Sequence, residues 1–243
     1  MKVGLIILAI GCVSIGALGL VSSIAGSHKR THSHSYSHSN AIFAGWNGEK
    51  GSGTIETETR AVGEFTRIET DLGVNLNIHV GEPQKLTVSI DDNLLDNIMT
   101  SVHGHTLEIT SRKSFSTEKD CNVEIWVQSL EAIECNGSGE IVVHGLKGNE
   151  FTYELNGSGD FSGSGSVASL HIEVNGSGNV DARRLLADEA EINISGSGDV
   201  QVNAKKLLDV DISGSGSLEY VGKPEHIRQS INGSGSVEPG KSI

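Results

Sequence analysis

A short polar motif recurs six times in the second half of the chain and holds many of the side chains that could do chemistry. One copy reads "NGSGDF", from Asn156 to Phe161. Its amide, hydroxyl and carboxylate groups predict one of two roles: turns in which Asn, Asp and Ser satisfy nearby backbone groups, or an outward polar strip that binds a partner. The candidate binding residues of the strip are Asn156, Ser158, Asp160, Asn175, Ser177, Asn179, Ser195, Ser197 and Asp199.

Calcium binding is one chemistry that the motif could support. The stretches "NGSGDF" and "SGSGDV" are similar to a glycine-rich repeat that binds calcium between turns of a β-helix. Calcium takes about six to eight oxygen ligands, usually with several carboxylates. The last polar position of the motif changes from Glu140 and Asp160 to Ser217 and Ser236 along the chain, and the repeat is about twice as long as the calcium repeat. The sequence therefore predicts no metal and no cofactor.

Catalysis on a β-helix would need convergent carboxylates, or a carboxylate beside Arg or Lys. The available residues are Glu140, Asp160 and Asp199, with Arg183 and Arg184 beyond them. The carboxylates are spaced by whole repeats, and nothing singles out one pair. Aromatic residues, which stack on sugar rings, make up only 4% of the chain. We therefore predict a protein that is not an enzyme, with a carbohydrate-active enzyme as the alternative.

The spacing of the motifs predicts the fold. Their central serines lie 20, 19, 20, 18 and 19 residues apart, and apolar residues alternate on both sides of each motif. Because successive strand residues point to opposite faces, the alternating residues form two inward columns. One column is Cys135, Leu155, Val174, Ile194, Ile212 and Ile231, and the other is Ile141, Phe161, Val180, Val200, Leu218 and Val237. These columns predict an all-β fold, a single-domain parallel β-helix (solenoid) with rungs of about 19–20 residues.

The glycines of each motif share the parity of the apolar columns, as Gly176 and Gly178 do. The chain could stay extended at these glycines and let the coil flatten, or it could bend there and use their freedom to adopt positive φ. In both alternatives the glycines face the crowded interior of the coil, and the polar residues of the motif face outward.

Residues 60–130 alternate in shorter apolar runs and predict an irregular N-terminal cap on the repeats of residues 131–238. Turns are expected at Gly81–Pro83 and at His103–His105, and a short helix is expected to begin near Asp92. A solenoid needs a cap because an open edge can pair with other chains. Cys121 and Cys135 share the inward parity, and two buried thiols are favoured because fourteen residues are fewer than one full coil.

Residues 1–26 predict a signal peptide or a membrane anchor, because no charge follows Lys2 until Lys29. Ala25 offers a cleavage site, and a lipoprotein signal ending at Cys12 is a third alternative. Residues 27–59 form a His/Ser/Gly-rich linker, whose histidines could hold a transition metal only loosely because no scaffold fixes their geometry. Each alternative predicts an extracytoplasmic location: periplasm, outer membrane or cell surface.

The charge of the chain limits its partners. The formal net charge is −13, and residues 41–243 alone carry 15 basic and 31 acidic groups. An acidic body argues against nucleic acid and against anionic lipid, because binding phosphate needs the opposite sign. A membrane contact is therefore expected only through the N-terminal segment, if that segment is not cleaved.

The repeated motif, together with "FTRIE" and "VSIDDNLL" before it, resembles the bacterial family described as putative auto-transporter adhesin, head GIN domain. The resemblance covers about residues 60–237. It implies a parallel β-helix in the cell envelope and brings no catalytic residues. We therefore expect a non-enzymatic envelope or surface protein that binds an unknown surface glycan or protein through its polar face, a purely structural periplasmic module being a further alternative.

Overall fold

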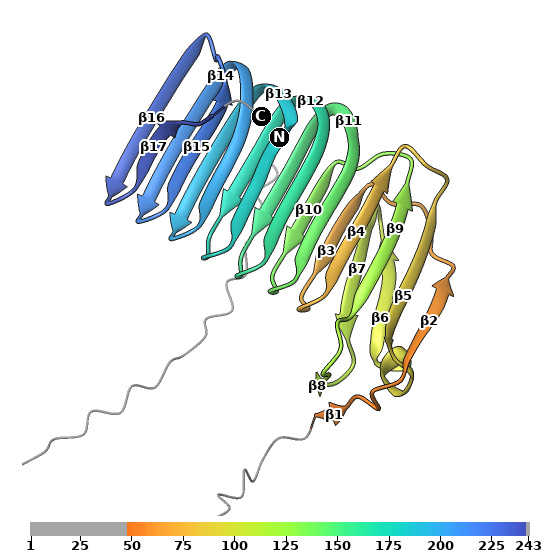
Figure 1. The fold of residues 1–243 in the computed structure, drawn as a ribbon. Helices are drawn as coiled ribbons and strands as arrows, with labels where there is room; N and C mark the ends of the chain where they lie inside the picture. Colours follow the sequence, from red (N-terminus) through yellow and green to blue (C-terminus); the bar gives the residue numbers. More distant parts are fainter. Residues whose placement is uncertain (1–47, 242–243) are drawn as a thin grey trace, which may run out of the picture. The chain divides into compact units, whose positions relative to one another are not determined.

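The computed structural model describes residues 48–241, which form β-strands and one short 3₁₀ helix (Figure 1). The cap strands are β1 (Glu49–Lys50), β2 (Ile55–Arg60), β3 (Arg67–Thr70), β4 (Asn75–Val80), β5 (Lys85–Asp91), β6 (Ile98–His103), β7 (Thr106–Ser111), β8 (Phe115–Ser116) and β9 (Asn122–Val127). The strands of the repeats are β10 (Ala132–Cys135), β11 (Glu140–Leu155), β12 (Asp160–Val174), β13 (Asn179–Gly196), β14 (Asp199–Gly214), β15 (Ser217–Gly222), β16 (His226–Gly233) and β17 (Ser236–Pro239).

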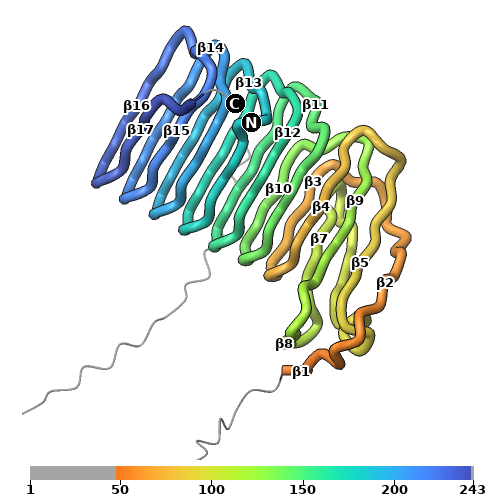
Figure 2. Tube along the Cα trace, viewed as in Figure 1, coloured from red at the N-terminus to blue at the C-terminus, as the bar shows by residue number. Residues whose placement is uncertain are grey.

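Strands β11 to β14 stack in parallel, and each bends near its middle so that it contributes to both sides of the coil (Figure 2). The register matches the predicted columns, because Leu155 pairs with Val174 and Val174 pairs with Ile194. The parallel β-helix predicted from the motif spacing is therefore confirmed, as a β-solenoid of about 5 turns.

The two predicted apolar columns form the core of the solenoid. From Cys135 to Ile212 and from Ile141 to Leu218, every column member is at most 3% exposed. The expectation is wrong at the last rung, where Ile231 is 39% exposed and Val237 is only partly buried. These residues lie on β16 and β17, and in the described part of the chain no further rung covers them.

The cap does not simply continue the repeats. The rung formed by β3 and β4 lies against β10 and β11 on one side and against β7 and β9 on the other. The chain therefore leaves this rung at Val80, builds the outer cap, and returns to the other side of it at Ala132. Antiparallel pairing of β2 with β5, β5 with β9, and β6 with β7 makes the cap irregular, as predicted.

Local elements of the cap follow the sequence signals. The 3₁₀ helix η1 begins at Asp92 as expected, but it ends at Asn97 because strand β6 begins at the next residue. Gly81 and Gly104 have φ values of 95° and 63°, which glycine adopts readily in turns. Strand β2 begins at Ile55, inside the segment expected as linker, because it pairs with β5.

The structure places both cysteines of the domain in the interior. Cys121 and Cys135 are buried free thiols, the state favoured by their spacing. Burial raises the pKa of the Cys121 thiol to about 12, and it also raises the pKa of Cys135. Both thiols are therefore protonated and unreactive at neutral pH.

The predicted signal or anchor and the four histidines after it lie outside the described residues. Within residues 48–241, no helix is long and apolar enough to cross a membrane.

Candidate functional site

The motif turns stack directly on one another along one edge of the solenoid, between the end of each long strand and the start of the next. From Ser158 onward, the backbone N–H of each central serine donates to the carbonyl of the first motif glycine one rung earlier. This bond is 3.1 Å from Ser158 to Gly137 and 3.2 Å from Ser177 to Gly157. The turns therefore extend the ladder of backbone hydrogen bonds around the corner of the coil, and they hold their polar residues at intervals of about 4.8 Å.

Close stacking of these turns explains the glycines. A Cβ atom at Gly176 would lie 1.8 Å from the Gly157 carbonyl oxygen, and one at Gly178 would lie 1.9 Å from the Gly159 oxygen. Both predicted conformations occur, because Gly176 has no left-handed φ whereas Gly214 has a φ of 142°. In both conformations, the carbonyl of the equivalent glycine one rung earlier leaves no room for a Cβ atom.

The asparagines that open the motifs form a hydrogen-bonded chain across the rungs. The Asn156 side-chain amide donates to Asn136 Oδ1 at 3.0 Å, and the Asn175 amide donates to Asn156 Oδ1 at 2.9 Å. Each amide also donates to the glutamate two residues before it, Glu154 or Glu173. These two candidate residues therefore satisfy one another, which is the turn chemistry that the sequence allowed.

The other candidate residues line the same corner. Asn179 donates to Asp160 Oδ1 from its side-chain amide at 2.9 Å and from its backbone N–H at 3.0 Å. Asp199 accepts a hydrogen bond from Ser217. All nine candidate residues are exposed, and they occupy three successive turns: Asn156, Ser158 and Asp160; Asn175, Ser177 and Asn179; Ser195, Ser197 and Asp199.

The residues considered for catalysis do not converge. Glu140, Asp160 and Asp199 begin their strands at the motif corner, whereas Arg183 lies where β13 bends at the far side. There the Arg183 guanidinium contacts Asp181 at 2.7 Å and lowers the pKa of that carboxyl. In the part of the chain that the structure describes, no group of three or more His, Cys, Asp or Glu is arranged to hold a metal ion.

A column of glutamates runs beside the asparagine chain. The register pairs Glu108 with Glu69, Glu69 with Glu134, Glu134 with Glu154, and Glu154 with Glu173. Partial burial raises the pKa of Glu69, and the nearby carboxylates of Glu134, Asp71 and Glu108 raise it further. Like charges on neighbouring strands repel, and the amides of Asn136, Asn156 and Asn175 offset part of this repulsion by donating to Glu134, Glu154 and Glu173.

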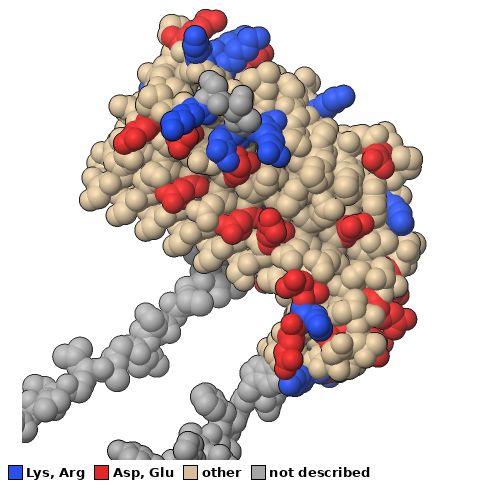
Figure 3. All heavy atoms as spheres, in the orientation of Figure 1, with Lys and Arg blue, Asp and Glu red and all other residues tan. Residues whose placement is uncertain are grey.

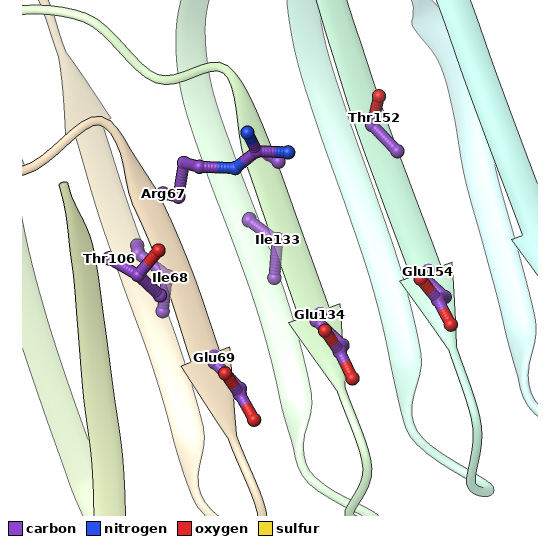
Figure 4. A pocket seen from close by; sticks show the side chains of 9 residues that line it. Arg67, Ile68, Glu69, Thr106, Ile133, Glu134, Thr152 and Glu154 are labelled. Carbon is purple, nitrogen blue, oxygen red and sulfur yellow. The ribbon is translucent and has the colours of Figure 1, made fainter. Parts of the chain in front are cut away.

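A shallow hollow of ≈ 120 Å³ lies over this column (Figure 4). The carboxylates of Glu69, Glu134 and Glu154 point the same way from β3, β10 and β11, and Arg67 lies toward the other end of the hollow. Ala132, on β10 between Arg67 and Thr152, also lines the hollow. Arg67 is exposed and forms no ion pair with any residue of the range 48–241.

Sequence analysis did not find the glutamate column. A signal was present in part, because Glu134, Glu154 and Glu173 each stand two residues before a motif asparagine. Glu69 and Glu108 carry no such signal, because the cap rungs do not follow the repeat. Their place in the column comes from the return of the chain around the rung of β3 and β4.

Comparison with known proteins gives the family. The family described as putative auto-transporter adhesin, head GIN domain, matches residues 64–224. The chain belongs to this family. The resemblance drawn from the motif and its leading segment is thereby confirmed. No curated protein is significantly similar to the chain in sequence.

Solved structures share the fold. A putative adhesin from Bacteroides fragilis is 24% identical with a TM-score of 0.66, and the match covers 79% of this chain and 100% of that one. A putative lipid binding protein from Parabacteroides distasonis is 27% identical with a TM-score of 0.50, covering 79% and 99%. A putative adhesin from the same species is 20% identical with a TM-score of 0.50, covering 80% and 100%. These solved structures show the shared fold, and the family description supports a surface protein.

Proposed function

We propose that this protein is an extracytoplasmic, non-enzymatic binding protein that recognises a repeating surface glycan or protein through its motif corner. The observation that supports this most is the in-register array of exposed polar groups on the stacked turns. The rungs hold these groups at a constant spacing of about 4.8 Å. A partner with its own repeat can therefore form the same contact several times.

The turns separate groups that hold the fold from groups that remain free. The Asn156 and Asn175 amides are used within the array, and their bonds fix the turns. The hydroxyls of Ser158, Ser177 and Ser197 are exposed on the same turns, with their backbone N–H groups already bonded. Such preorganised groups lose little conformational freedom when they bind, which favours affinity.

The neighbouring glutamate column and the hollow beside Arg67 extend this polar surface. Together they offer carboxylates, hydroxyls and one guanidinium on a rigid sheet. Hydroxyl and amide groups of a glycan or of an extended peptide can both donate to such carboxylates. We assign this surface to binding and not to turnover, because its carboxylates form a regular column and no acid–base pair stands apart from it.

A purely structural envelope module is the second candidate, and the asparagine chain favours it. If every polar group of the turns served only the fold, replacing the free serines would change nothing beyond the turns. The experiment must therefore alter the free groups and leave the amide chain intact.

The test compares residues 27–243 with a variant that carries Ser158→Lys, Ser177→Lys and Ser197→Lys. A control variant adds the same charge at exposed serines elsewhere: Ser114→Lys, Ser116→Lys and Ser230→Lys. Binding to a glycan panel and to whole bacterial cells is measured, and all three proteins are checked for folding by circular dichroism. Binding that the first variant loses and the control keeps supports recognition by the corner. If neither the parent nor the variants bind glycans or cells, the structural module is the better account.

A further inference from the structure

The bends opposite the motif corner gather the basic residues of the repeats. Seven of the eight cations between residues 131 and 241 lie at or beside these bends, and the eighth, Arg228, lies on β16. Figure 3 shows the blue side chains gathered over the bends, whereas red side chains dominate nearer the motif turns. We call these seven residues the basic edge: Lys147, Arg183, Arg184, Lys205, Lys206, Lys223 and Lys241.

Several cations of the basic edge are available to a partner. Arg183 is held by Asp181, and Lys206 is held by Asp188 at 2.8 Å. Lys205 approaches Asp188 only to 4.0 Å. The other four members of the basic edge form no ion pair with any residue of the range 48–241, and all four are exposed: Lys147, Arg184, Lys223 and Lys241.

An apolar side chain projects among these cations. The register of β13 with β14 shifts between Ala182 and Leu186, so β13 carries extra residues at its bend. Leu186 is the residue at which the pairing with β14 resumes, opposite Asn203, and it is 40% exposed, two residues after Arg184. A bulge re-aims side chains away from the regular ladder. Here the bulge carries Arg184, and the exposed side chain of Leu186 lies just beyond it in the chain.

We propose that the basic edge docks on a surface of anionic lipid headgroups, with Leu186 entering the interface. Lys and Arg near such a surface are attracted to it, and an apolar side chain adds affinity by burial among the acyl chains. A soluble polyanion would use the cations but would leave Leu186 in water, so the leucine favours a lipid surface.

The overall negative charge does not oppose this docking at physiological salt. About six strand residues, or roughly 20 Å, separate the basic edge from the acidic motif corner. Charges more than about 8 Å apart are largely screened at that ionic strength. The composition alone argued against anionic lipid as a partner of the body, because it could not show that the charges are segregated. Docking by this edge would leave the motif corner pointing away from the lipid.

The experiment uses residues 27–243, which omit the apolar segment that could itself enter a bilayer. The compact unit begins at Gly45, and the solved relatives match 79% of the chain over their whole length, so this unit folds without the segment. Co-sedimentation is measured with vesicles of phosphatidylcholine alone and of phosphatidylcholine with phosphatidylglycerol. The edge variant carries Arg184→Gln, Lys205→Gln and Lys223→Gln, and a control variant removes the same charge from the cap through Arg112→Gln, Lys113→Gln and Lys119→Gln.

We expect the parent to bind only the anionic vesicles, with a partition coefficient that falls as salt rises. Each cation near the surface contributes about fivefold, so the edge variant should lose about a hundredfold and the cap variant far less. Leu186→Asn should weaken binding to the vesicles without changing binding to heparin. Equal losses in the edge and cap variants would overturn the proposal, because net charge alone would then govern binding. Failure of the parent to bind anionic vesicles, or binding to heparin only, would overturn it as well.

Discussion

Replacing Gly178 by alanine tests whether rung-to-rung contact is the reason for the motif glycines. The new Cβ would lie 1.9 Å from the Gly159 carbonyl oxygen and 2.7 Å from Leu155 Cδ2, and Gly178 has no left-handed φ that would add strain. Contacts under 3.0 Å force a shift, and here the nearest atom belongs to the backbone. The rungs must therefore separate by about 1 Å, against a normal spacing of about 4.8 Å.

Two costs add up in this variant. Overpacking a tight interior costs about 1–3 kcal/mol, and each weakened backbone hydrogen bond, such as that from Ser177 to Gly157, costs about 1 kcal/mol more. We expect Gly178→Ala to lower the free energy of unfolding by about 3 kcal/mol. For a domain of this size the melting temperature should fall by about 6–12 °C.

The matched control is Gly148→Ala, because a Cβ at Gly148 has no neighbour closer than 3.7 Å and its φ is not left-handed. Urea unfolding followed by circular dichroism measures both variants. We expect the control to lie within about 0.5 kcal/mol of the parent. If Gly178→Ala were as stable as the control, close stacking of the turns would not be the reason for the glycines.

Three other changes test the interior and the polar columns. Tyr153→Phe should leave the free energy of unfolding unchanged or raise it by about 1 kcal/mol, because the buried Tyr153 hydroxyl has no hydrogen-bond partner among residues 48–241. A lower free energy of unfolding in urea would show a hydrogen bond that this account lacks. Asn156→Ala should cost about 1–2 kcal/mol by removing amide bonds to Asn136 and Glu154, and an unchanged urea midpoint would refute a structural role for the chain. Because the pKa of Glu69 is raised in the folded state, stability should fall as pH rises through the folded pKa. Glu69→Gln should therefore stabilise the protein at pH 7 and lose this advantage below the ordinary pKa of Glu, and thermal melts across that range would contradict the reasoning if the difference were constant.

The sequence was sufficient for the regular part of the fold. Period-two alternation fixed the inward columns, because one face of every strand must be buried. The prediction of burial failed at Ile231, because alternation gives the direction of a side chain but does not tell whether another rung covers that side chain. The cap was predicted only as irregular, because the 65-residue step from Glu69 to Glu134 depends on pairing between distant segments.

The candidate surfaces were predictable to different degrees. The motif corner could be found because each polar residue recurs at the period of the coil. The glutamate column was missed at Glu69 and Glu108, which the fold brings beside the repeats without any sequence periodicity. The basic edge was hidden by the overall charge, because Arg184 and Lys223 reach the same edge of the coil only when the rungs stack. Segregation of charge is a property of the folded coil and not of composition.

The most direct test of the account is the affinity of the motif corner for the surface that the parent protein binds. It compares parent, corner variant and control variant on bacterial cells, with bound protein measured against concentration. The account predicts that Ser158→Lys, Ser177→Lys and Ser197→Lys together weaken binding by at least about tenfold, or roughly 1.4 kcal/mol, while the control with lysines at Ser114, Ser116 and Ser230 binds like the parent. Equal affinity of a folded corner variant and the parent would contradict it, and the stacked turns would then serve only the fold.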